Sequence, residues 1–302
     1  MPGERSRTSR LPDSPVVLVT GCASGIGLAL ARRLAGWRDA RVVVTARATS
    51  LGRIEAAGIE PGERLWVRGL DVTSNSDRKR VVSEIEDKLG GVDVLINNAG
   101  LTFRSTHEHL HTDEILEQLA VNFIGPMDLA RLVLPGMRRK RTGHIVNVSS
   151  VGGMMAMPTM GVYSASKFAL EGASEALWYE MRPWGVHVTL VQPGFIHSES
   201  FRNVRLSRDA EALRSVDGDG YRAVYESMTP FIEGLMSWAL ATPDTVAKRI
   251  LKTIERPNPP LRVSATIDAR VFYMVRRLLP RRLYHWILYR CLPHVGRWGP
   301  PR

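Results

Sequence analysis

The sequence predicts an α/β protein in which helices cover both faces of a doubly wound, mostly parallel β-sheet. Apolar runs of strand length alternate with amphipathic helical stretches from Val16 onward. The runs are apolar on both faces, as expected of strands that helical crossovers join and bury on both sides. No repeat, linker or low-complexity tract divides the 302 residues, of which 44% are hydrophobic, so we expect a single domain.

Composition limits the classes of protein to which the chain can belong. The only two cysteines, Cys22 and Cys291, lie at opposite ends, and metal-ligand spacings such as CxxC and HExxH are absent. We therefore expect a reducing, cytoplasmic location, no disulfide framework and no metal. Residues 1–14 hold three arginines but no apolar stretch of signal-peptide length, which predicts a disordered leader.

The net charge of +11 is concentrated near the C-terminus. Residues 256–302 contain ten arginines and one acid, Asp268, and so contribute most of this charge. A uniformly basic surface would have favoured nucleic-acid binding, whereas a near-neutral body with a cationic tail does not. Because no nucleic-acid-binding motif is present either, we expect no nucleic-acid partner.

A glycine-rich turn follows the first apolar run, in VVLVTGCASGIGLALARRLAG. Gly21, Gly25 and Gly27 lie between a predicted strand and a predicted helix. Backbone N–H groups and the positive end of the helix can receive a pyrophosphate there with no Cβ in the way. The spacing is GxxxGxG rather than the common GxGxxG, and a packing turn is the alternative. The alternation of strands and helices favours a dinucleotide site.

The residues at the end of the second apolar run indicate which of the two nicotinamide cofactors the protein binds. The stretch VVVTARATS has Ala46 where an acidic residue usually holds the ribose 2′-OH, followed by Arg47, with no carboxylate until Glu55. A guanidinium pairs bidentately with a 2′-phosphate, which a carboxylate would repel. The sequence therefore predicts NADP(H) rather than NAD(H), with a solvated strand end as the alternative role of Arg47.

A possible proton-transfer site lies in the stretch SSVGGMMAMPTMGVYSASK. Tyr163 and Lys167 are one helical turn apart and share a helix face. A free tyrosine has a pKa of about 10, and a neighbouring cation is expected to lower it toward the working pH. Ser150 ends the fifth apolar run and can hydrogen-bond a substrate oxygen as charge develops there, with Ser149 as the competing serine.

These motifs resemble those of the short-chain dehydrogenase/reductase family. TGCASGIG matches the family's cofactor turn TGxxxGIG, NNAG matches its segment after the fourth strand, and Tyr163 follows Ser150 by the family's interval of thirteen. The resemblance runs from residue 16 to about residue 265 and implies a Rossmann-type fold. It also implies that the tyrosine is the acid in reduction and the base in oxidation, and that the asparagine in AVNFIGP distorts its helix and holds a water. The implied catalytic residues are Asn122, Ser150, Tyr163 and Lys167.

The same resemblance implies a cofactor-binding set. Asp71, in LDVT, would contact the adenine ring, and QPGFIHS would cap the nicotinamide, with Ser198 where the family usually has threonine. The implied residues are Gly21, Ser24, Gly25, Ile26, Gly27, Arg47, Asp71, Val72, Asn98, Ala99, Gly100, Tyr163, Lys167, Pro193, Gly194, Ile196 and Ser198.

The substrate class follows from a subgroup likeness and from apolar residues near the site. VTGCASGIG and YSASKFALEG are most similar to retinol and 17β-hydroxysteroid dehydrogenases. Residues 199–240 are expected to form a substrate lid, and four methionines between Ser150 and Tyr163 would line an apolar wall. We expect a lipophilic alcohol or carbonyl such as a retinoid, a steroid or a long-chain lipid aldehyde or ketone. A 3-ketoacyl or ketosphinganine substrate, or a non-catalytic NADP(H)-binding sensor, is the alternative.

The chain thus divides into a leader (1–14), an NADP(H)-binding oxidoreductase domain (15–266) and a basic amphipathic segment (267–302), and we expect a homodimer or homotetramer. Residues 270–292 carry apolar helical stripes flanked by arginines, and their longest charge-free run is too short to span a bilayer. We expect peripheral contact with the cytoplasmic face of a membrane. Packing against a partner subunit, or over the substrate pocket, is the alternative.

Overall fold

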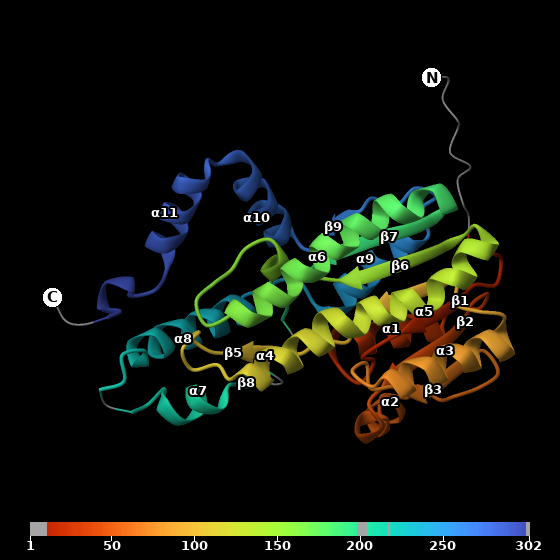
Figure 1. Cartoon of the computed structure of the whole chain (residues 1–302), viewed down its shortest axis with the longest axis horizontal. Coiled ribbons are helices and arrows are strands. Elements are labelled where there is room, and N and C mark those ends of the chain that lie inside the picture. The colour runs from red at the N-terminus through yellow and green to blue at the C-terminus, as the bar shows by residue number, and fades with distance from the viewer. Residues whose placement is uncertain (1–10, 198–203, 217, 300–302) are drawn as a thin grey trace.

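Seven parallel strands form the central sheet, in the order β3-β2-β1-β4-β6-β7-β9 (Figure 1). The structure is a computed structural model and describes residues 11–197, 204–216 and 218–299. The chain runs outward from β1 in one direction and then crosses to β4, so the sheet is doubly wound as predicted. The strands are β1 (Val16–Val19), β2 (Arg41–Ala46), β3 (Leu65–Gly69), β4 (Val94–Asn97), β6 (Gly143–Val148), β7 (Val186–Gln192) and β9 (Arg262–Ser264).

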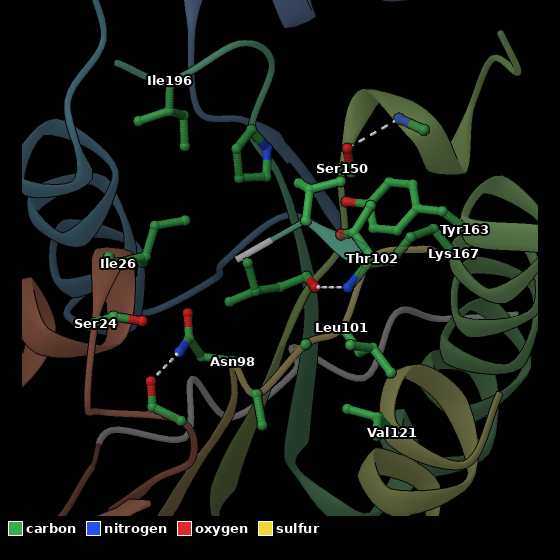
Figure 2. Close-up of a pocket in the computed structure, with 18 of the residues that line it drawn as sticks. Ser24, Ile26, Asn98, Leu101, Thr102, Val121, Ser150, Tyr163, Lys167 and Ile196 are labelled. Carbon is green, nitrogen blue, oxygen red and sulfur yellow. Dashed lines mark hydrogen bonds between the residues drawn. The ribbon is translucent and has the colours of Figure 1, made fainter. Parts of the chain in front are cut away.

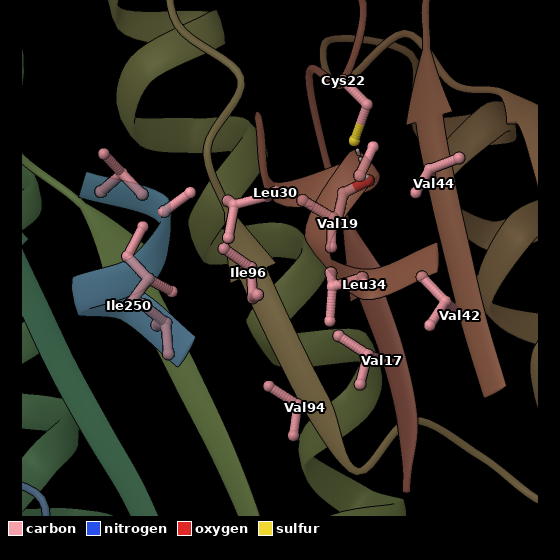
Figure 3. Packing of buried hydrophobic residues seen from close by; sticks show 14 of the residues in the cluster. Val17, Val19, Cys22, Leu30, Leu34, Val42, Val44, Val94, Ile96 and Ile250 are labelled. Atoms are coloured by element: carbon pink, nitrogen blue, oxygen red, sulfur yellow. Dashed lines mark hydrogen bonds between the residues drawn. The ribbon is translucent and has the colours of Figure 1, made fainter. Parts of the chain in front are cut away.

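Helices cover both faces of this sheet. One face is packed by α1 (Gly25–Ala35), α2 (Gly52–Glu55) and α9 (Pro243–Ile254), and the other by α3 (Asn75–Leu89), α5 (Gly125–Lys140) and α6 (Gly161–Met181). In β1, Val17 and Val19 face the first helix layer while Val16 and Leu18 face the second. Figure 3 shows the first layer, with Leu30 and Ile250 against the strands. Both sides of each strand must therefore be apolar.

A smaller unit lies beside the carboxyl end of the sheet. The short strands β5 (Phe103–Arg104) and β8 (Arg205–Leu206) pair in parallel, and α4 (Thr112–Leu119), α7 (Arg208–Leu213) and α8 (Arg222–Ser237) accompany them. Helix α8 buries Val224, Met228 and Ile232 in one cluster, with Met157 and Met160 packed against it. Of the expected lid, residues 199–203 and 217 lie outside the described residues; the rest forms β8, α7 and α8.

The C-terminal segment contains α10 (Ile267–Leu278) and α11 (Arg281–Cys291), which leave the body near β9 and return toward α8 (Figure 1). Its inner side contacts the body: Phe272 packs against the cluster that contains Met154 and Met155, and Trp298 packs against α8. The segment therefore packs on the body, and whether it covers a substrate pocket stays a prediction. Within the described ranges, no helix combines the length and the apolar character needed to cross a membrane.

Candidate active site

A cavity of about 780 Å³ opens at the carboxyl ends of the parallel strands. Residues that follow β1, β2, β4, β6 and β7 line it, where the strand order reverses. Figure 2 shows Ser150, Tyr163 and Lys167 on one side and Ser24 and Ile26 on the other. Open α/β sheets bind ligands at this topological switch point.

The glycine turn between β1 and α1 forms one wall. Gly21 has a φ of +73°, and a Cβ there would lie 2.7 Å from the Ala99 Cα. A Cβ on Gly27 would lie 2.1 Å from the Gly21 carbonyl oxygen, so Gly27 packs behind the turn and does not line the cavity. The Ser24 side chain caps no N–H of α1. The positive end of α1 therefore opens on the cavity.

The loop after β4 is fixed to the glycine turn by Thr20, a residue that the sequence analysis missed. The backbone N–H groups of Asn98 and Ala99 each donate to the Thr20 hydroxyl at 3.0 Å. The Asn98 amide Nδ2 donates to the backbone oxygens of Thr20 at 2.9 Å and Gly21 at 3.2 Å. Thr20 therefore connects, by hydrogen bonds, the two loops that are expected to hold the cofactor.

Two arginines, Arg47 and Arg53, line the end of the cavity beside β2. The sequence analysis missed Arg53, in α2, because it belongs to no motif named there. Only its place a few residues after the second strand could have indicated it. Asp71 also lines this end, and its Oδ1 accepts hydrogen bonds from the Thr73 backbone N–H at 2.8 Å and hydroxyl at 2.7 Å. These bonds fix the carboxylate, while both guanidinium groups remain exposed.

Tyr163 and Lys167 reach the cavity from the first two turns of α6. The Lys167 Nζ lies 5.9 Å from the Tyr163 ring centre and donates to the Val148 carbonyl oxygen at 2.9 Å. Burial lowers the pKa of Lys167 to about 8, partly opposed by the charge of Glu171. The expected lowering of the Tyr163 pKa is not found. Burial raises it, and the nearby Ser150 hydroxyl offsets only part of that rise.

The two candidate serines have different surroundings. The Ser149 hydroxyl is buried and donates to Glu171 Oε1 at 2.8 Å. The Ser150 hydroxyl accepts from the Gly152 backbone N–H at 3.0 Å and is the serine that acts on the Tyr163 pKa. A Cβ on Gly152 would lie 2.8 Å from Tyr163 Cε1, so a glycine there lets the ring approach. This geometry favours Ser150.

Asn122 lies in a π-helical turn (Ala120–Ile124) between α4 and α5, so the expected helix distortion is present. Its Oδ1 accepts from the Leu101 N–H at 2.8 Å, and its Nδ2 donates to the Leu101 carbonyl at 2.9 Å and to Ser166 Oγ at 3.0 Å. The side chain is fully buried and does not line the cavity. The contacts of Asn122 hold the loop after β4 against α6. The water that this asparagine is expected to hold stays a prediction.

The turn after β7 is held by the start of α10. The Gly194 N–H donates to Thr266 Oγ1 at 2.9 Å, and the Phe195 N–H donates to Asp268 Oδ2 at 2.7 Å. A Cβ on Gly194 would overlap the Asp268 carboxylate. Thr266 and Asp268 were missed, although the single acid of the basic tail was a signal. Ser198 lies outside the described residues.

Most of the predicted site residues therefore surround one cavity. The predicted residues that line it are Gly21, Ser24, Gly25, Ile26, Arg47, Asp71, Val72, Asn98, Ala99, Gly100, Ser150, Tyr163, Lys167, Pro193, Gly194 and Ile196. Among the described residues, no three His, Cys, Asp or Glu side chains gather where they could hold a metal ion.

Comparison with known proteins assigns the family. The short chain dehydrogenase profile matches residues 15–209. The chain belongs to the short-chain dehydrogenase/reductase family. Retinol dehydrogenase 8 of Homo sapiens is 34% identical over 91% of this chain and 90% of its own length. Human 17-beta-hydroxysteroid dehydrogenase type 1 is 36% identical, covering 83% and 77% of the two chains. The 3-ketodihydrosphingosine reductase of Bacteroides thetaiotaomicron is 34% identical, covering 82% and 86%.

Solved structures of the same family share this fold. A short-chain dehydrogenase from Streptomyces avermitilis superposes with a TM-score of 0.74 at 29% identity, covering 92% of this chain and 98% of that one. A metagenomic short-chain oxidoreductase in complex with NADP gives a TM-score of 0.61 at 26% identity, covering 84% and 97%. This short-chain dehydrogenase/reductase is thus an oxidoreductase with a Rossmann-type fold.

Proposed function

We propose that this protein transfers a hydride between NADP(H) and a lipophilic alcohol or carbonyl compound, with Tyr163 as general acid and base. The observation that carries the proposal is the single cavity that holds the glycine turn, Arg47, Ser150, Tyr163 and Lys167. A dinucleotide site and a proton donor there share one space, as hydride transfer requires.

The residues present fit a nicotinamide dinucleotide. The uncapped start of α1 suits a pyrophosphate, and Arg47 and Arg53 suit a 2′-phosphate. When bound, the nicotinamide would supply or accept the hydride. The NADP in the metagenomic relative supports the preference for the phosphorylated cofactor.

The protein's own groups would manage the proton and the charge on the substrate oxygen. Because its pKa is raised, Tyr163 keeps its proton through neutral pH, which is the form that can donate to a carbonyl oxygen during reduction. Ser150 would donate a hydrogen bond to the same oxygen. Lys167 is charged below about pH 8, where its ammonium can hydrogen-bond a cofactor ribose.

The lining on the other side of the cavity is apolar. Met155, Met157, Met160, Ile232 and Met236 face it, and thioether side chains adapt to long apolar ligands. The names of the human relatives indicate retinoid and steroid substrates for those proteins, and the bacterial relative's name indicates a ketosphinganine. We therefore place retinoids, steroids and long-chain lipid aldehydes or ketones first and ketosphinganine second.

A substrate panel tests this proposal. NADPH oxidation is measured with retinal, a 17-ketosteroid, long-chain aldehydes, 3-ketosphinganine and small polar aldehydes. We expect a lipophilic compound to have the highest kcat/KM, with roughly tenfold gained for every one to two buried methylene groups. The apolar-pocket assignment is wrong if the small polar aldehydes are the better substrates. A 3-ketosphinganine that exceeds every other compound would select the second substrate class.

We also propose that the outer side of α10 and α11 docks on an anionic membrane surface on the cytoplasmic side. The exposed apolar residues there recur at helical spacing, with Leu278 at 78% and Trp286 at 58% exposure. Exposed arginines flank them. The outer residues are Ile267, Val271, Met274, Leu278, Leu283, Trp286 and Tyr289. Assembly into a homodimer or homotetramer is a further part of the proposal, supported by exposed aromatic residues such as Tyr179 on α6.

Flotation with anionic liposomes tests the membrane contact. Arg281→Gln/Arg282→Gln should weaken binding at low salt by roughly 30-fold, since each arginine near the surface contributes about 1 kcal/mol. Arg32→Gln/Arg38→Gln removes two exposed arginines in and just after α1, outside the C-terminal segment, so it is the matched control and should float like the native protein. Unchanged NADPH affinity would show that each variant is folded. Equal recovery of the arginine variant and the native protein at low salt would overturn the proposal.

A further inference from the structure

Arg104 is a buried arginine that lines the substrate side of the cavity. It is only 4% exposed and lies in β5, which pairs with β8. Charged side chains are almost never so deeply buried without a partner of opposite charge. Arg104 therefore requires a physical explanation that the hydride-transfer residues do not give.

The described residues give this guanidinium one neutral partner. Its Nη2 donates to the Thr229 hydroxyl of α8 at 3.1 Å. Its Nε is buried, and no described residue accepts a hydrogen bond from it. Glu233 attracts Arg104 electrostatically, but no carboxylate among the described residues lies within ion-pair distance. A buried donor without a partner costs free energy comparable to a hydrogen bond to a charged group.

Neighbouring arginines of the same unit are paired. Arg205, which pairs with Phe103 in the β5–β8 ladder, bonds Glu117 at 3.2 Å, and Arg208 bonds Asp113 at 2.6 Å. Burial lowers the pKa of Arg104, but an arginine keeps its charge at any physiological pH. The buried guanidinium of Arg104 is thus the one of these three that has no carboxylate partner among the described residues, and Arg104 lines the cavity.

The position of Arg104 separates it from the expected cofactor phosphates. Its partner Thr229 belongs to α8, as does Ile232, which also lines the cavity. Arg47 and Arg53 come instead from the segment after β2, beside the glycine turn. An anion bound at Arg104 would therefore lie on the apolar, α8 side, among the residues assigned to the substrate.

We propose that Arg104 binds an anionic group, a carboxylate or a phosphate ester, carried by the lipophilic substrate. This inference rests on the proposed function and narrows its substrate class to amphipathic lipids with a reactive carbonyl and a separate anionic head. Such a ligand would give the buried guanidinium a charge-assisted partner, while its chain lies against the methionines. A neutral retinoid or steroid would offer Arg104 no anion, and Thr229 would remain its one hydrogen-bond partner among the described residues.

Matched substrates test the proposal. NADPH oxidation is measured with ω-oxodecanoate, ω-oxododecanoate and ω-oxotetradecanoate, with their methyl esters, and with an ω-oxoalkyl phosphate. We expect the native enzyme to prefer an anion over its neutral ester in kcat/KM by roughly 10- to 100-fold at the best chain length, the range of a hydrogen bond between charged groups. The phosphate and carboxylate arms show which anion is preferred.

Variants separate this role from a structural one. Arg104→Met should bring the ratio of kcat/KM values for the acid and its methyl ester close to one, because this ratio cancels any effect that the substitution has on both substrates alike. Arg104→Lys should keep part of the preference. Thr229→Val removes the only hydrogen-bond partner found for Arg104 among the described residues, and it should leave the acid preference intact. Loss of the preference in Thr229→Val and Arg104→Lys alike would indicate that Arg104 only positions α8.

A binding measurement keeps the inference independent of turnover. Calorimetry on the native protein with NADPH present should show tighter binding of dodecanoate than of dodecanol. Equal affinities for the two ligands would overturn the proposal, whatever the variants do. If no carbonyl compound is reduced but dodecanoate binds preferentially and Arg104→Lys retains that preference, the anion site stands and the proposed reaction fails.

Discussion

Tyr163→Phe is expected to lower kcat for carbonyl reduction by roughly 10²- to 10⁴-fold, the usual contribution of a positioned general acid. The ring packs beside Gly152, where any Cβ would collide with it, and phenylalanine preserves that packing. The substitution removes the hydroxyl whose proton the raised pKa retains at neutral pH. The measurement is single-turnover NADPH oxidation with the best substrate of the panel, together with the dissociation constant of NADPH.

The adjacent serines provide a matched control for this prediction. Ser150→Ala should also lower kcat, since its hydroxyl lies beside Tyr163. Ser149→Ala should mainly lower the melting temperature, because it removes a buried hydrogen bond to Glu171. Near-normal turnover by Tyr163→Phe with NADPH bound would refute the proposed mechanism. Equal losses of kcat in both serine variants would refute the assignment of Ser150.

The sheet could be predicted from the sequence because its signal is local and repeated. Val16 to Val19 are all apolar since alternate residues serve two helix layers, and the other runs follow the same rule. The glycine turn could also be predicted, because Gly21, Gly25 and Gly27 recur within seven residues directly after the first apolar run. Packing constraints of this kind leave a pattern within a few residues of one another.

Residues that act across large sequence separations could not be found in this way. Asp268 holds the turn at Phe195, and Arg104 meets Thr229, through contacts that only the folded chain creates. The tail shows the same limit. Its apolar helical stripes were expected to contact a membrane, but Phe272 packs inward while Val271 points outward. Helical spacing identifies a stripe without saying which neighbour covers it.

The pKa of Tyr163 is governed by burial and not, as the spacing of the two residues suggested, by the charge of Lys167. One helical turn does place Lys167 near Tyr163, as expected. However, the lysine donates its hydrogen bond to the Val148 carbonyl; its side chain is buried and that of Tyr163 is half-buried. Desolvation disfavours the phenolate and the ammonium alike, so it raises one pKa and lowers the other. Burial depends on the whole fold, which a local motif does not report.

Arg47→Asp is expected to lower the preference for NADPH over NADH, as a ratio of kcat/KM values, by roughly 10²- to 10³-fold. Arg47 directly follows β2 and lines the cavity; it is exposed and has no ion pair among the described residues, so it is available to a 2′-phosphate. The substitution would remove the proposed charge-assisted pair between Arg47 and the 2′-phosphate and would place a carboxylate against that dianion. The same carboxylate can accept a hydrogen bond from the 2′-OH of NADH, so the NADH value should rise as the NADPH value falls.

Two further variants make the cofactor prediction specific to position. Arg53→Gln should lower the same ratio by roughly tenfold, the value of one lost charged hydrogen bond, because it lines the same end of the cavity. Arg38→Asp changes the net charge equally but lies away from the cavity lining, so its ratio should match that of the native enzyme. An unchanged ratio of the kcat/KM values for NADPH and NADH in Arg47→Asp would show that Arg47 does not bind the 2′-phosphate. An equal fall in Arg38→Asp would show a response to overall charge, since long-range attraction raises the encounter rate of any anionic ligand.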